Sequence, residues 1–349
     1  MSSPRTRGFS LVELMIAMTI SLILLAGILS VVYSSKVTYR EGERVARLQE
    51  NGRTAVEMML RDMRAGGFRG CTRTVPFTNT LVDANTLLWN FGSVVQGFNY
   101  VGPGVTTGAW APARSTLITD ALPASDIVAV RTVRTNMPSF TTNAAMASTT
   151  AEVSVDRLAT DTLPTGRTVL ISDCNAAAVF AVSEFEGSGT TATLHHETGI
   201  TGAGPGNDSI DIGFEFQAGA QVVPVDTVIY YVRQSDTVRD GVRNPSLWRI
   251  VGAGDPQELI EGVEAMQVQY GRDTDGNRIV DDYVDASAAI NWDQIVSVTF
   301  SLLIRSAEPT ATEADPRTFR LIGTDYGPFG DRYERTIYTT TVTLRNTTS

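Results

Sequence analysis

The sequence contains few of the residue types on which most enzyme chemistry depends. Among its 349 residues, Lys36 is the only lysine, and His195 and His196 are the only histidines. Because no lysine follows position 36, the rest of the chain lacks a phosphate-loop lysine, a Schiff-base lysine and a Ser–Lys dyad. The chain also has no Gly-x-Ser-x-Gly turn and no dinucleotide-binding fingerprint. We therefore predict that the protein is not an enzyme and requires no cofactor.

The two histidines do not form a known metal motif. They are adjacent, whereas the paired histidines of a helical zinc site need wider spacing. No cysteine or second acidic cluster lies nearby, so we predict a surface turn at His195-His196. Ser188 lies between two glycines and is expected in a flexible loop, without catalytic partners.

The charge balance argues against nucleic acid as the main partner. The formal net charge is -10, and arginine and lysine do not cluster beyond the N-terminus. Apolar residues make up 42% of the chain and charged residues 19%, which is too apolar a composition for a disordered chain. We expect a folded domain that binds no nucleic acid.

The N-terminus has the organisation of a membrane anchor. Arg5 and Arg7 precede a segment, from Leu14 to Val32, that is almost wholly apolar. About 20 helical residues span the hydrocarbon core of a bilayer. Positive charge before the segment predicts a cytoplasmic N-terminus and an exported C-terminus. An ordinary secretory signal has a shorter apolar core and a small-residue cleavage site. A plain signal anchor remains the alternative, with Glu13 in the membrane interface.

The residues at the start of this segment resemble the type IV prepilin leader motif. The stretch from Gly8 to Leu14 reads GFSLVEL. The resemblance implies that a prepilin peptidase cleaves between Gly8 and Phe9 and that Phe9 is then N-methylated. Glu13 falls at the position of the family's glutamate, the fifth residue of the mature chain. In an apolar bundle of helices, its carboxylate would offset the charge of a neighbouring subunit's Phe9 amine and set axial register.

The rest of the chain predicts one long helix followed by strands. No proline occurs between Arg5 and Val75, residues 34–65 are rich in helix formers, and Gly66-Gly67 is a plausible helix end. We expect an α+β, type IV pilin-like fold, in which the helix packs on an antiparallel β-rich domain. The expected parts are a leader at 1–8, a helix at 9–65 (transmembrane over 9–33, amphipathic over 34–65), and a periplasmic or extracellular domain at 66–349.

Short apolar or alternating segments predict the strands. Residues 187–207 and 309–331 are expected to be loops. Residues 77–122 resemble no known segment, and their function is not predicted. The predicted strands are Asp126–Arg131, Arg167–Ser172, Val179–Phe185, Val225–Val232, Val263–Tyr270, Ile295–Ile304 and Arg335–Leu344.

Several downstream stretches resemble the PilW family of minor type IV pilins: Arg64–Cys71, Ser172–Cys174 with Val179-Phe180, Glu258–Met266, Tyr270–Gly276 and Thr340–Asn346. The resemblance implies a minor pilin in the filament or its tip and initiation complex. The expected partners are prepilin peptidase, other minor pilins, the major pilin, the inner-membrane assembly platform and a tip adhesin. The expected location is the bacterial inner membrane before assembly and the pilus or cell surface afterwards. A large pseudopilin of a type II secretion system is the alternative.

Cys71 and Cys174 are the only cysteines. The even count fits one disulfide in an oxidising compartment, and two buried free thiols are the alternative. Evidence for export favours the disulfide. Its loop of roughly 100 residues would contribute about 4 to 5 kcal/mol in the chain-entropy model.

An acidic segment after position 272 is the one candidate ion site. Oxygen donors at alternate positions can converge around Ca²⁺ in a tight loop. Arg278 in place of a turn glycine and Val284 in place of a bidentate glutamate count against this interpretation. The alternative is an acidic turn capped by its own side chains. The candidate ligands are Asp273, Asp275, Asn277, Asp281 and the Ile279 carbonyl.

Overall fold

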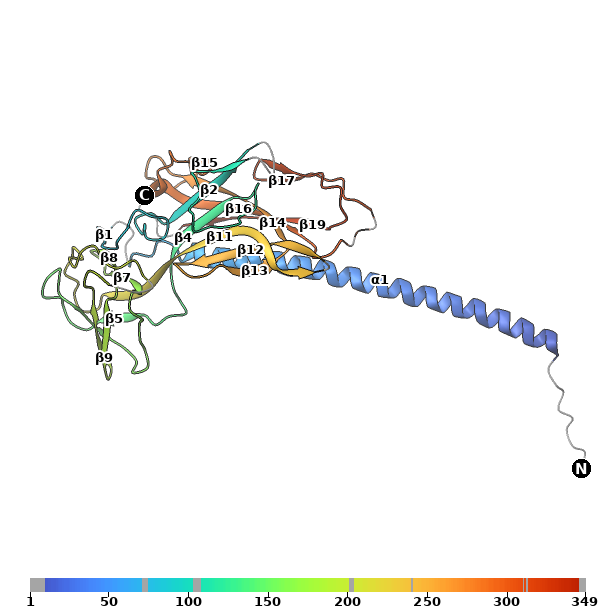
Figure 1. Cartoon of the computed structure of the whole chain (residues 1–349), viewed down its shortest axis with the longest axis horizontal. Helices are drawn as coiled ribbons and strands as arrows, with labels where there is room; N and C mark the ends of the chain where they lie inside the picture. The colour runs from blue at the N-terminus through green and yellow to red at the C-terminus, as the bar shows by residue number, and fades with distance from the viewer. Residues whose placement is uncertain are drawn as a thin grey trace, which may run out of the picture. The chain divides into compact units, whose positions relative to one another are not determined.

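The computed structural model describes residues 10–344 except 71–74, 103–107, 201–203, 240, 310 and 312. The chain divides into two units, residues 1–50 and 51–349, which are described separately. One α-helix, α1 (Leu11–Arg64), belongs to both (Figure 1).

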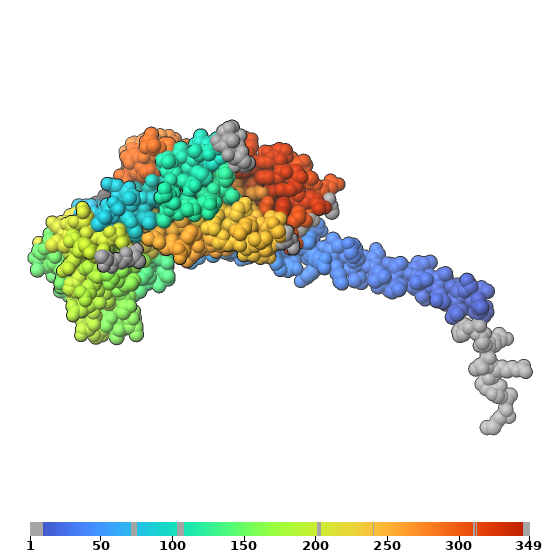
Figure 2. Space-filling model, viewed as in Figure 1, coloured from blue at the N-terminus to red at the C-terminus, as the bar shows by residue number. Residues whose placement is uncertain are grey.

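In the first unit, α1 presents its apolar side chains to the surroundings. Every large apolar side chain from Leu11 to Val31 is at least 52% exposed. The space-filling view draws this part of the helix as a single rod of side chains (Figure 2). An 18-residue window here is apolar enough to cross a membrane, and none of it is buried. Further along, Arg47 and Glu43 form an exposed ion pair one helical turn apart, at 2.6 Å.

In the second unit, the end of α1 is part of the core. Ala55, Met59 and Met63 recur every four residues, so they share one helix face, and all three are fully buried. Gly52 lies on the ring of Tyr338, where a Cβ would fall 2.1 Å from the nearest ring carbon. This half of the helix therefore packs on the β-rich domain, as expected from the sequence.

The helix ends where the glycine pair predicts. Gly67 has a left-handed φ of 71°, a conformation that glycine adopts without the steric cost of a Cβ. Its amide donates to the carbonyl of Arg131 at 2.9 Å. The turn thus fastens the end of the helix to a central strand.

A 13-stranded sheet forms most of the domain. Strand β11 (Gln221–Arg239) is its longest member, and its first residues pair with β5 and β7 while its later residues pair with β4 and β12. Pro224, which has no N–H for a ladder, lies near this change of partners. All pairings are antiparallel except that of β1 with β8. The other members are β1 (Phe77–Asn79), β2 (Val95–Val101), β3 (Ala109–Ala111), β4 (Ile127–Val133), β5 (Phe140–Thr142), β6 (Val153–Asp156), β7 (Thr168–Ser172), β8 (Ala177–Ala181), β9 (Glu184–Ser188), β10 (Thr191–His195), β12 (Val242–Val251) and β13 (Gln257–Glu261).

A second, four-stranded sheet runs in the order β15-β14-β16-β19 and is wholly antiparallel. In the central strand β16, Val298, Phe300 and Leu302 share one face, as the sequence predicts, and are fully buried. Most side chains on the other face of this strand are buried as well. The remaining elements are β14 (Val263–Arg272), β15 (Asp282–Val284), the 3-10 helix η1 (Trp292–Gln294), β16 (Ile295–Arg305), β17 (Phe319–Leu321), β18 (Thr324–Tyr326) and β19 (Arg335–Thr343).

Some strand predictions were wrong in extent. The predicted strand Val179–Phe185 is divided between β8 and β9, and the predicted loop 187–207 contains β10. The predicted loop 309–331 contains the β17–β18 hairpin. These strands are three to five residues long, and strands of that length are too short for alternation to distinguish them from turns.

Candidate functional site

The predicted assembly residue, Glu13, lies in the first turn of α1 and is exposed. Its carboxylate accepts a hydrogen bond from the Ser10 amide at 3.1 Å, and the Ser10 hydroxyl accepts one from the Val12 amide at 3.2 Å. At the N-terminus of the helix, a serine side chain and a glutamate side chain three residues later thus each accept a backbone hydrogen bond. This arrangement resembles a capping box. The sequence S-x-x-E could have revealed this role. Gly8 and Phe9 lie outside the described residues, so cleavage and methylation there stay predictions.

The exposed apolar side chains that follow Glu13 need another environment. Burying an apolar side chain stabilises by about 25 cal/mol for each Å² removed from water, and this chain leaves the whole stretch from Leu11 to Val31 uncovered. Lipid, or apolar helices of other subunits, would supply that environment. This half of α1 is therefore suited to membrane anchoring and to helix–helix association.

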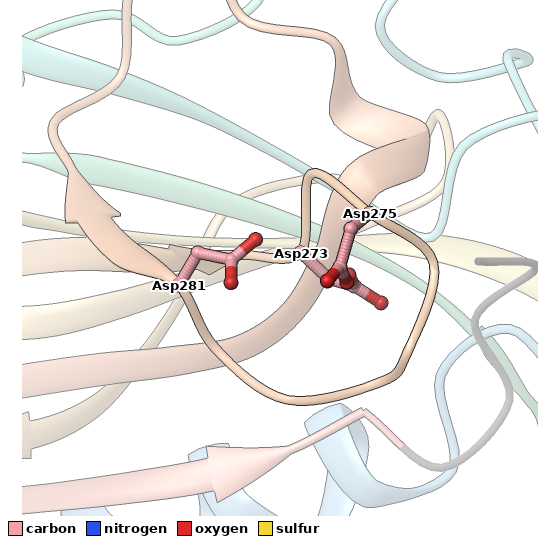
Figure 3. A group of neighbouring side chains, drawn as sticks. All are labelled: Asp273, Asp275 and Asp281. Carbon is pink, nitrogen blue, oxygen red and sulfur yellow. The ribbon is translucent and has the colours of Figure 1, made fainter.

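The acidic loop joins β14 to β15 and brings three carboxylates together. One oxygen from each of Asp273, Asp275 and Asp281 lies within 4.8 Å of the others. Figure 3 shows Asp273 and Asp275 side by side, with the Asp281 carboxylate directed toward them across the loop. This grouping is compatible with a divalent cation held by oxygen ligands.

Hydrogen bonds within the loop hold these groups in place. Asp273 is 1% exposed and accepts from the amides of Gly276 and Arg278 at 2.8 and 2.7 Å. Burial raises its pKa, but these backbone hydrogen bonds outweigh burial, so the pKa of Asp273 is lowered. Asp281 accepts from the Thr274 amide at 2.7 Å.

The two remaining predicted ligands also belong to the loop's own turns. The Asn277 side-chain oxygen accepts from the Ile279 amide at 2.7 Å. Arg278, which counted against the site because it replaces a turn glycine, has a φ of 68°. It therefore adopts the left-handed conformation that the glycine would supply, at some backbone cost.

The two cysteines belong to segments that meet. Cys174 lies between β7 and β8, and Cys71 lies outside the described residues. Gly70, the residue before Cys71, packs so closely that a Cβ would fall 2.9 Å from the Asp173 carbonyl oxygen. On the other side, the Ala177 amide donates to the Pro76 carbonyl at 3.0 Å. This geometry supports the predicted pairing, which stays a prediction.

The histidine pair is not a surface turn, and that prediction was wrong. His195 is the last residue of β10. Its Nδ1 lies 2.8 Å from a carboxylate oxygen of Glu152, and its Nε2 lies 3.7 Å from one of Glu186. His196 is 4% exposed, lies 5.2 Å from the Phe180 ring, and its Nε2 is 2.9 Å from the Ala151 carbonyl. Consecutive side chains near the end of a strand point to opposite faces of the sheet, so His196 points into the core while His195 points toward the two glutamates. Ser188 likewise ends β9 and is not part of a loop.

A buried carboxyl that the sequence did not single out joins the two sheets. Asp126 is 2% exposed and accepts from the amides of Tyr100 and Val268 at 2.8 and 2.9 Å. Burial raises the pKa of Asp126 to about 7, against the effect of those two hydrogen bonds. A carboxyl at the start of a strand gives no sequence signal that separates it from a turn residue.

These features define a class of protein. A long apolar N-terminal helix that continues into a large antiparallel-rich β domain is pilin-like architecture. Residues 229–346 match the family model described as Type IV Pilus-assembly protein W, PilW. Residues 3–29 match the model described as Prokaryotic N-terminal methylation motif. No curated protein and no solved structure matches the chain. The chain is a PilW-like, pilin-like protein related to the type IV pilus, as its sequence predicts.

Proposed function

We propose that the protein is a minor pilin that is incorporated into a type IV pilus, or into its tip and initiation complex, and promotes pilus assembly. The observation that carries the proposal is the uncovered apolar helix surface behind Glu13 in a chain that matches both the PilW and the N-terminal methylation models. Exposed apolar side chains on one helix are a surface on which helices of other subunits can pack.

The proposed sequence of events follows from the residues at the N-terminus. Arg5 and Arg7 retain the leader in the cytoplasm while the domain is exported. Prepilin peptidase cleaves between Gly8 and Phe9, and Phe9 is methylated. The anchored subunit then joins other minor pilins and the major pilin at the inner-membrane assembly platform. The matching families are structural, and this role requires no catalytic residue.

The cleavage step gives the first test. We expect the membrane-extracted protein to begin with an N-methylated Phe9, as measured by N-terminal mass analysis. Gly8→Val should leave the full-length chain uncleaved and reduce its recovery in sheared filaments to background, because the peptidase needs the small residue at this position. Ser3→Val, in the same leader, is the matched control. A wild-type chain that begins at Met1, or after Tyr33, would contradict the proposal.

A type II secretion pseudopilin is the second candidate function, because it would share the leader and helix. The match of residues 229–346 to PilW favours the pilus. Deletion of the gene separates the two: loss of surface pili with normal protein secretion supports the minor pilin, and the reverse result supports the pseudopilin.

We also propose that the acidic loop binds Ca²⁺ weakly, with a dissociation constant on the order of 1 mM. The convergence of Asp273, Asp275 and Asp281 supports this. Titration of the full-length protein in detergent should show one site that Asp275→Asn removes. Asp208→Asn, an exposed aspartate elsewhere, should leave it unchanged. Absence of binding at 10 mM Ca²⁺ would mean that the loop is an acidic turn capped by its own side chains.

A further inference from the structure

A small cavity lies where the turn after α1 meets strand β4. Its volume is about 20 Å³, enough for one water-sized particle. The loop residue Arg69 lines one side, and Arg131 and Thr132 of β4 line another. The hydrogen bond from the Gly67 amide to the Arg131 carbonyl holds the two sides together.

Both arginines are buried and bonded only to neutral groups. Arg69 is 7% exposed, donates to the Gly92 carbonyl, and lies 4.4 Å from the centre of the Phe77 ring. Arg131 is 3% exposed and donates to the Leu87 carbonyl at 2.8 Å and to the Gln96 side chain at 3.0 Å. Within the part of the chain that the structure describes, neither makes an ion pair with a carboxylate.

Other buried arginines of this domain are paired. The fully buried side chain of Arg335 lies 2.6 Å from both Glu264 and Asp331. Arg167 lies 2.6 Å from Asp226. A buried charge is stable only when it is paired or neutralised. The two arginines at the cavity differ from Arg335 and Arg167 because neither makes an ion pair within the described part of the chain.

The surroundings of the cavity leave this positive charge in place at neutral pH. Burial lowers the pKa of Arg131 to about 9, which keeps the guanidinium protonated at pH 7. Burial also lowers the pKa of Arg69, and the charge of Asp293 partly offsets that effect. Most of the remaining lining residues are apolar (Phe68, Phe91, Val94, Val133, Leu170 and Val225), so the two arginines are the charged residues among those that line the cavity.

We propose that this cavity binds one small monovalent anion, chloride, between Arg69 and Arg131. Water would satisfy the donors but would leave the two charges uncompensated. Sulfate and phosphate have a central atom and four oxygens, and so do not fit a space for one water-sized particle. The bound anion would fasten the turn after α1 to β4 and thereby stabilise the domain.

Thermal unfolding tests the proposal on the full-length protein in detergent at constant ionic strength. Replacing 0.2 M gluconate by 0.2 M chloride should raise Tm saturably by roughly 2 °C or more. Arg131→Met should abolish the chloride dependence. Arg305→Gln, which breaks the ion pair with Glu264 in the four-stranded sheet, should lower Tm yet keep the chloride dependence.

Bromide gives a direct readout that holds even if Arg131→Met fails to fold. Crystals soaked in bromide should show an anomalous peak between Arg69 and Arg131. The absence of that peak, or equal Tm values in chloride and gluconate, would overturn the proposal and leave the cavity as a water site.

Discussion

Both halves of α1 carry apolar side chains, yet the two halves use them differently. In residues 51–349, Ala55, Met59 and Met63 are fully buried within the domain. In residues 1–50, the stretch from Leu11 to Val31 stays exposed. The first group follows helical spacing and alternates with charged residues, whereas the second is apolar on every side. A one-sided apolar stripe indicates packing within the chain, and an apolar surface all round indicates lipid or partner helices.

This comparison predicts that changes in the second unit affect folding and that changes in the first unit affect assembly. The predicted Cys71–Cys174 disulfide should give the largest effect on folding. Replacing both cysteines by alanine should lower the free energy of unfolding by up to about 4 to 5 kcal/mol, because the unfolded chain regains the freedom of a long loop. Denaturant unfolding of the full-length protein in detergent measures this.

Peptide mapping without reductant checks the pairing itself. We expect one linked peptide pair that contains Cys71 and Cys174. Recovery of two alkylatable thiols from native protein would refute the disulfide, and an unfolding free energy unchanged by the double substitution would show that the loop closure contributes nothing.

Core packing of the helix should give the next largest effect. Met59→Ala should destabilise the domain by about 2 to 5 kcal/mol, because a fully buried side chain leaves a cavity. Ile23→Ala is the matched control, since Ile23 is 72% exposed and its truncation should change domain stability by less than about 0.5 kcal/mol. Equal losses for the two variants would break the distinction between the halves.

The sequence predicts the strongly periodic and strongly apolar parts of this fold. The helix end at Gly66-Gly67 and strands such as β14 and β16 follow from local patterns that tertiary packing reinforces. The long hairpin of β11 and β12 was missed beyond Val232, because Gln234, Ser235 and Asp236 interrupt the apolar run while the ladder continues past a bulge.

The candidate sites divide in the same way. The leader and Glu13 form one contiguous motif, and the acidic loop is local in sequence, so both could be found by reading the chain. The cavity between Arg69 and Arg131 unites residues 62 positions apart in the sequence. Asp126 likewise bonds to Tyr100 and Val268, from two different strands. Sites of this kind are made of residues that are far apart in the sequence, so they become visible only once the pairing of distant strands is known.

Glu13 should have the smallest effect on the folded domain and a large effect on assembly. Glu13→Ala removes the carboxylate proposed to meet a neighbouring subunit's Phe9 amine in an apolar helix bundle. Loss of one partner from a buried charge pair is costly, so incorporation into filaments should fall. Export, cleavage and the free energy of unfolding of the domain should not change, because Glu13 contributes nothing to the core of residues 51–349. Quantification in sheared filaments and in the membrane fraction measures both.

The capping role of Glu13 makes Glu13→Gln the decisive variant. Glutamine can replace glutamate in a capping box and still accept from the Ser10 amide, but it carries no charge. If the charge pair docks the subunit, glutamine should fail in assembly nearly as completely as alanine does. If the cap is what matters, glutamine should restore assembly and only alanine should fail. A subunit at the very tip has neighbours on one side alone, so part of the incorporation should survive there even without the charge. Normal copurification of Glu13→Ala with filaments and partner pilins would show that neither the cap nor the charge pair is how this subunit docks.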